Sequence, residues 1–97
     1  MIHLVAKLRA VPGKEIFLAK ECVKMAGKVR LNEKGCVLYA PYVSLEDSTE
    51  IVFIEQYTDQ EALDYHRKTS YMKEFKDKII PVLAEPLDVK ILVEETV

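Results

Sequence analysis

The chain has 97 residues and a formal net charge of −2 at pH 7. This length predicts one domain over residues 1–97, and the charge argues against nucleic acid or an anionic membrane as a partner. No apolar run is long enough to span a membrane, and His3, Lys7 and Arg9 interrupt the first apolar residues, which argues against a signal peptide. We therefore expect a cytoplasmic protein whose two cysteines, Cys22 and Cys36, are reduced thiols.

The first half of the chain predicts a strand, a helix and a second strand. Residues alternate over Met1–Val11 until Pro12-Gly13 ends the strand, and helical spacing follows over Lys14–Arg30. Gly35 suits a positive φ in the next turn, and Pro41 makes the strand Cys36–Leu45 an edge strand or a bulged one. The buried stripe of the helix is expected to hold Ile16, Ala19, Val23 and Ala26, widened by Phe17, Cys22, Met25 and Val29.

The second half predicts a third strand, two short helices and a last strand. Ile51–Tyr57 is apolar on both faces, and a capping box of Thr58 and Glu61 then begins a helix. Thr69-Ser70 is a second cap signal. Pro81 should kink or end the second helix near Ile80, before the strand Leu87–Val93. The stripe of that second helix holds Met72, Phe75, Ile79, Val82 and Leu83.

The element order is β-α-β-β-α-β, with the second helix split in two. This order is typical of the α+β, ferredoxin-like fold, in which four strands form one antiparallel sheet with the helices on one face. The third strand is apolar on both faces, and Val5 lies on the minority face of the first strand. A sheet face open to water is normally more polar, so we expect a second copy of the sheet to cover it in a homodimer. A monomer with a partly apolar face is the alternative.

The spacing of the ligand-type residues does not predict a metal or nucleotide site. His3 and His66 are the only histidines, and neither stands in a Cys-x-x-Cys or His-x-x-x-His pattern. The three glycines never occur in a phosphate-binding spacing. We therefore expect no metal and no cofactor, and any reaction would use ordinary side chains.

His66 is the sharpest catalytic candidate. It lies on the inward face of its predicted helix, where it can act as a general base near neutral pH, or alternatively cap the helix end as a structural residue. Glu55 shares a face with Phe53 and Tyr57, and burying its carboxylate is costly unless it is paired. It would orient His66, or instead bond to Arg9 or Lys7. Tyr39 and Tyr57 would line a pocket or belong to the core.

Three stretches resemble the antibiotic-biosynthesis monooxygenase family. They are E-Q-Y-T-D-x-E-A-L-D-Y-H-x-x-T-S-Y-M-K-x-F from Glu55 to Phe75, A-V-P-G-K-E from Ala10, and E-K-G-C-V-L-Y-A-P from Glu33. The last run is similar to that of small bacterial quinol monooxygenases. Glu55 and His66 stand at the family's Glu and His positions. Tyr57 replaces the family's usual Trp, and Ser70-Tyr71 replaces its Pro-His.

The resemblance implies a dimeric αβ barrel that oxygenates a quinol or similar electron-rich aromatic with O2, without metal or flavin. Haem-degrading relatives need an Asn and a His where this chain has Ala6 and Lys76, which argues against haem. A non-catalytic small-molecule-binding dimer and an isomerase of a phosphorylated signalling sugar remain as alternatives. The predicted site contains His66 and Glu55 as catalytic residues and Phe53, Tyr57, Tyr71, Met72, Phe75 and Tyr39 as substrate-binding residues.

Overall fold

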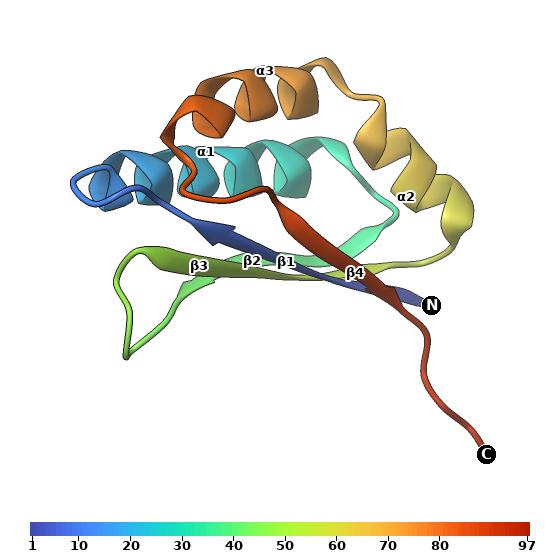
Figure 1. Ribbon diagram of the computed structural model, residues 1–97. Helices are drawn as coiled ribbons and strands as arrows, with labels where there is room; N and C mark the ends of the chain where they lie inside the picture. The colour runs from blue at the N-terminus through green and yellow to red at the C-terminus, as the bar shows by residue number, and fades with distance from the viewer.

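The computed structural model describes residues 1–97 as a four-stranded antiparallel sheet with three helices on one face (Figure 1). The elements are β1 (Ile2–Arg9), α1 (Glu15–Asn32), β2 (Cys36–Val43), β3 (Glu50–Tyr57), α2 (Gln60–Arg67), α3 (Ser70–Ile79), a 3-10 turn (Ile80–Val82) and β4 (Asp88–Leu92). The predicted ferredoxin-like order, including the divided second helix, is confirmed.

The strand order in the sheet is β2-β3-β1-β4, so the first and third strands lie in the centre. The strand that contains Pro41 lies at an edge, as predicted, where a missing backbone donor costs least. Its pairing with β3 shifts register between Cys36 and Leu38, which marks a bulge at Val37. Beyond the bulge, Tyr39 stands directly opposite Glu55.

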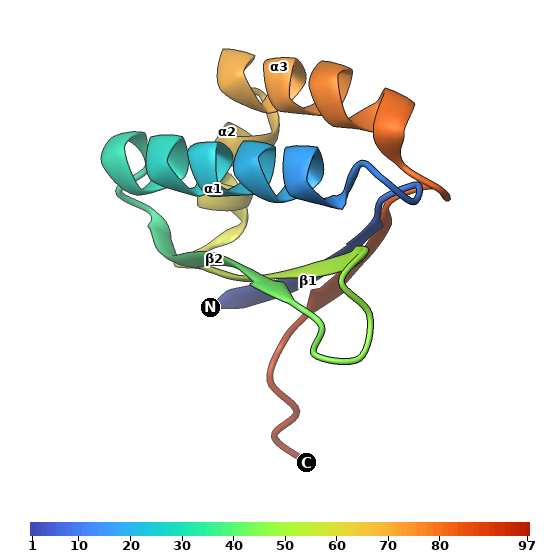
Figure 2. The ribbon, with the colours of Figure 1, turned by 90° about the vertical axis from the view of Figure 1, so that its left-hand side faces the viewer.

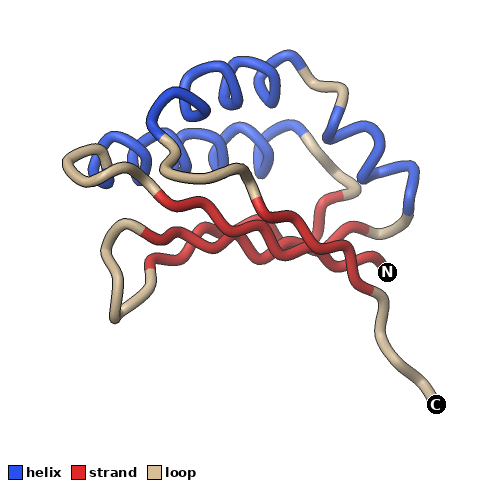
Figure 3. Tube along the Cα trace, viewed as in Figure 1, coloured by secondary structure: helices blue, strands red, loops and turns tan.

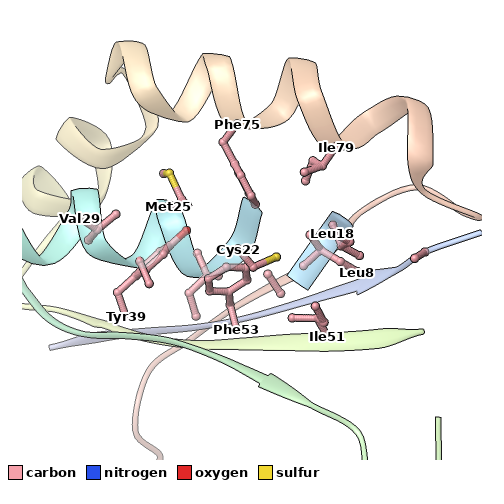
Figure 4. Close-up of a cluster of buried hydrophobic side chains, with 14 of the residues drawn as sticks. Leu8, Leu18, Cys22, Met25, Val29, Tyr39, Ile51, Phe53, Phe75 and Ile79 are labelled. Atoms are coloured by element: carbon pink, nitrogen blue, oxygen red, sulfur yellow. The ribbon is translucent and has the colours of Figure 1, made fainter. Parts of the chain in front are cut away.

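The core lies between the sheet and the helices (Figure 4). The inward residues of β1 are buried as its alternation predicted, from Leu4 to Leu8, while Lys7 is exposed. Phe53 rises from β3 to meet Phe75 of α3, with ring centroids 6.2 Å apart and nearly perpendicular planes. This edge-to-face contact joins the sheet to the outer helix layer.

The predicted buried stripe of α1 was partly wrong. Ile16 and Val23 are 69% and 65% exposed, whereas Leu18, which was not predicted, is fully buried. The helix carries apolar residues on more than one side, so spacing alone does not fix which side faces the sheet. The side that packs is made by Leu18, Glu21, Cys22, Met25, Ala26 and Val29.

The ends of the short helices follow local chemistry. Asp59, not Thr58, caps α2, because its side chain accepts a hydrogen bond from the Ala62 amide at 2.9 Å. Thr69 caps α3 as predicted and accepts from the Met72 amide. The last helix ends at Ile79, and the 3-10 turn that follows contains Pro81, which confirms the break expected there.

Gly35 serves a close approach rather than a positive φ. Only Gly13 has a positive φ, of 94°. A Cβ added at Gly35 would lie 2.6 Å from the Cβ of Ala62, which no side chain tolerates without movement. Gly35 therefore lets the start of β2 pack against α2, and this contact holds α2 over the end of the sheet.

The sheet face opposite the helices has no covering element, as the tube (Figure 3) and the ribbon turned by 90° (Figure 2) both show. Ile54 stands at its centre between Ala40 of β2 and Val5 of β1, and it is 41% exposed. Tyr42 and Val52 form the next pair along this face. None of the helices combines the length and apolar composition that crossing a membrane requires.

Candidate active site

A cavity of about 290 Å³ lies between the sheet and the two short helices. This volume is at the lower end of the usual range for ligand pockets, roughly 300–1,000 Å³, and fits a small molecule. Ten of its fourteen lining residues are hydrophobic, so the interior is mainly apolar. The lining consists of Leu4, Ala6, Leu8, Tyr39, Phe53, Glu55, Leu63, His66, Arg67, Met72, Phe75, Lys76, Leu87 and Val89.

His66 is buried in the last turn of α2 and faces the sheet. Leu63, three residues earlier, is fully buried and fixes this side of the helix against the core. The imidazole lies between two tyrosine rings, with centroids 5.2 Å from Tyr39 and 5.5 Å from Tyr57. Packing against these two rings restricts the imidazole independently of its hydrogen bonds.

The partner of His66 is Glu33, which is not among the predicted site residues. His66 Nδ1 lies 3.1 Å from both carboxylate oxygens of Glu33, and the hydroxyl of Tyr71 donates to Oε2 of the same carboxylate. The prediction that Glu55 orients His66 was wrong. One signal could have pointed to Glu33: it directly follows a long helix, where a carboxylate is unfavourable beside the helix dipole unless another group holds it.

This pairing determines what the imidazole can do. An ionised carboxylate only accepts hydrogen bonds, so it selects the tautomer with the proton on Nδ1 and leaves Nε2 with a free lone pair. Nε2 has no hydrogen-bond partner within the chain. Every fully buried polar side-chain atom of this protein does have a partner, so Nε2 must be accessible, and the accessible space beside it is the cavity that His66 lines. Burial lowers the pKa of His66, and Glu33 opposes that shift. The ring is therefore a neutral base.

Glu55 is a second buried acid in the same cavity, 4% exposed. Its one hydrogen bond comes from the hydroxyl of Tyr57, 2.5 Å from Oε1, so neither Arg9 nor Lys7 is its partner. Burial raises the pKa of Glu55 to about 7, although the Tyr57 hydroxyl opposes the shift. This carboxyl therefore gains and loses a proton near neutral pH.

The structure brings six of the eight predicted site residues to the cavity wall: Glu55, His66, Tyr39, Phe53, Met72 and Phe75. Tyr57 and Tyr71 do not line it. Their hydroxyls donate hydrogen bonds to Glu55 and Glu33 respectively. Their place in the structure is that of hydrogen-bond donors to the two buried acids. No cluster of three or more His, Cys, Asp or Glu side chains is arranged as metal ligands.

Solved structures of other proteins share this fold along nearly the full chain. A Caulobacter crescentus protein whose name assigns it to the antibiotic biosynthesis monooxygenases is 30% identical, with a TM-score of 0.90 over 96% of this chain and 90% of its own. A Pseudomonas aeruginosa protein is 26% identical, with a TM-score of 0.89 over 98% of this chain and 94% of its own. A Mycobacterium tuberculosis protein is 25% identical, with a TM-score of 0.90 over 98% and 95%.

The sequence comparisons agree with the structural ones. An uncharacterised protein of Synechocystis is 37% identical over 60 residues, which are 62% of this chain and 41% of that protein, so the chain spans less than half the length of this curated relative. The model of the antibiotic biosynthesis monooxygenase family matches residues 1–78. With most of the chain matched and the same fold present, this protein belongs to the antibiotic biosynthesis monooxygenase family.

Proposed function

We propose that this protein is a cofactor-independent monooxygenase that oxidises a quinol or similar electron-rich aromatic with O2. The observation that carries the proposal is the buried imidazole of His66. Its Nδ1 is fixed by Glu33, and its Nε2 is free in a small, mainly apolar cavity. A base positioned in this way can remove a phenolic proton where little water competes.

The chemistry needs such a base because O2 has a triplet ground state and reacts slowly with neutral phenols. Nε2 would take the proton, and the resulting anion would pass one electron to O2. Recombination of the two radicals forms a carbon–oxygen bond and a hydroperoxide. Loss of water from the hydroperoxide leaves a hydroxylated quinone. One oxygen atom stays in the product and the other leaves as water, so four electrons from the quinol reduce one O2.

The two buried acids have separate roles in this scheme. Glu33 is a positioning residue: it holds the tautomer of His66 and stabilises the imidazolium once the base has taken its proton. Glu55 lines the cavity and has a pKa of about 7, so it can supply the proton that leaves with oxygen as water. Tyr39, Phe53 and Phe75 would hold the aromatic ring of the substrate.

We further propose that the working form is a homodimer in which the open sheet faces of two copies pack together. The support is the apolar centre of that face, around Ile54, Val5 and Val52, which no element of the chain covers. A surface of this kind is normally buried against a partner.

The test is quinol-dependent oxygen uptake with menadiol as substrate, corrected for autoxidation. His66→Ala should lower turnover by about 10²–10⁴-fold, the usual range for loss of a general base. Glu33→Gln should lower turnover less and change its pH profile, since it keeps the shape but loses the charge that stabilises the imidazolium. Tyr65→Ala is the matched control, because Tyr65 directly precedes His66 on α2, is exposed and does not line the cavity. Wild-type turnover in His66→Ala would refute the proposal and favour a binding role for the same cavity.

A further inference from the structure

Two cationic side chains line the cavity that contains His66. Arg67 is the last residue of α2, and Lys76 lies in the second half of α3, so they approach from different helices. Both residues are exposed, whereas the lining from β1 and β3 is buried. The two cations therefore stand at the opening of the cavity, and the apolar wall lies deeper.

Neither cation has an acidic partner in the chain. The other lysines of α3 do: Lys73 pairs with Asp77 at 3.0 Å, and Lys78 lies 3.8 Å from Glu21. Arg67 and Lys76 form no ion pair and no side-chain hydrogen bond within the chain. Their charges are thus available to a molecule that enters the cavity.

The charge of the lining is unbalanced. Glu55 is its only acid, and burial raises the pKa of that carboxyl to about 7, so part of its population is neutral at physiological pH. Both cations lower the pKa of His66, and Arg67 also opposes the rise at Glu55, which places them close enough to act on the reacting groups. With neutral His66, the lining carries a net positive charge that complements an anion.

We propose that Arg67 and Lys76 form an anion-binding subsite, and that the substrate is a hydroxylated aromatic carrying an acid group such as a carboxylate. The inference rests on the proposed function for the position of the ring. The hydroxylated ring lies inside, against Phe53 and Phe75 and near Nε2 of His66. The acid group stays at the opening, between the guanidinium of Arg67, which offers a planar pair of donors, and the ammonium of Lys76, which offers a compact charge.

This arrangement fixes which end of the substrate reacts. An acid group would not enter the apolar interior, because an unpaired charge there is costly. It therefore stays at the mouth and presents the opposite end of the molecule to the imidazole. Because the cations are partly in solvent, each should contribute a modest effect that salt screens.

Binding can be measured without turnover by calorimetry, using 4-hydroxy-1-naphthoate, whose hydroxyl and carboxylate lie at opposite ends of one ring, and its neutral counterpart 1-naphthol, neither of which is a quinol. Wild-type protein should bind the acid more tightly than the neutral phenol, and the preference should shrink in high salt. Arg67→Gln and Lys76→Gln should each weaken acid binding by roughly three- to tenfold and leave naphthol binding unchanged. Lys68→Gln is the matched control: it removes the same charge from a neighbouring exposed residue that does not line the cavity.

Oxygen uptake separates this inference from the proposed function. Relative to wild type, the double variant Arg67→Gln/Lys76→Gln should raise the KM for 1,4-dihydroxy-2-naphthoate severalfold more than the KM for 1,4-dihydroxynaphthalene. Any change in kcat that follows from the effect of the cations on His66 should be the same for both quinols. Tighter acid binding that depends on the two cations, without turnover, would support the subsite and refute the monooxygenase. Equal binding of acid and phenol, a preference that survives in the double variant, or no binding of either ligand would refute the subsite, whatever the turnover.

Discussion

Glu55→Gln should make the protein more stable at alkaline pH, although it removes a group from the candidate site. Burial raises the pKa of this carboxyl from 4.5 to about 7. A group whose pKa is higher in the folded state contributes stability that is complete below its unfolded pKa and is lost as pH rises through the folded pKa. Ionisation of Glu55 thus lowers the stability progressively from about pH 4.5 to about pH 7, and the loss is complete above pH 7.

The size of the effect follows from the shift. A difference of about 2.5 pH units corresponds to roughly 3 kcal/mol between the two protonation states. Glutamine does not titrate, and its amide oxygen can still accept the hydrogen bond from Tyr57. The variant should therefore exceed wild type in unfolding free energy by less than about 1 kcal/mol near pH 5 and by about 3 kcal/mol near pH 8.

Urea unfolding of both proteins from pH 5 to pH 8.5, at one protein concentration, measures this difference directly. The titration of His66 is present in both proteins and largely cancels in the difference between them. Glu74→Gln, at an exposed position of α3, is the matched control and should give a flat difference across pH. If the Glu55→Gln difference is also flat, or favours wild type at high pH, then the carboxylate is stabilised in the fold and the reasoning from burial is wrong.

Two further substitutions test the packing and the assembly. Gly35→Ala should destabilise the protein by about 1–3 kcal/mol in thermal or urea unfolding, because the added Cβ would clash with Ala62. The control Gly27→Ala lies in mid-helix, where the added Cβ meets nothing within 4 Å, and should stabilise the protein by about 0.5–1 kcal/mol. Equal effects of the two substitutions would contradict the close approach at Gly35. Ile54→Glu should split the proposed homodimer or unfold it, since an unpaired buried charge costs several kcal/mol. The control Val23→Glu, on the outer side of α1, should keep the wild-type mass in light scattering. A monomeric wild-type protein would contradict the assembly.

Features set by neighbouring residues could be predicted from the sequence. The alternation of β1, the Thr69 cap and the break at Pro81 each depend on a few adjacent positions, and each was found as expected. Pro41 likewise indicated an edge strand from its missing amide alone. In these cases local sterics and hydrogen bonding leave one favourable solution.

Features set by tertiary contact could not be predicted. Glu33 and His66 are separated by 33 positions, and their pairing depends on α2 lying over the end of α1, which Gly35 permits. The burial of Leu18 in place of Ile16 depends on how α1 rotates onto the sheet. Periodicity limits such choices, but the packed neighbours decide them.

The candidate site contains two buried carboxyls, Glu33 and Glu55, that receive different hydrogen bonds. This difference connects the stability of the fold to the chemistry of the site. Glu33 receives two donors, from His66 and Tyr71, and faces the side of the imidazole away from its free nitrogen. Glu55 receives one donor, from Tyr57, and faces the cavity. The first arrangement favours a fixed carboxylate that holds a base in one tautomer, and the second favours a carboxyl that exchanges protons near neutral pH. Glutamine at position 55 would remove the destabilising charge together with that exchange. A buried carboxyl with a perturbed pKa that destabilises the fold and faces a cavity is the kind of group that functional sites contain, and this favours proton chemistry in the cavity.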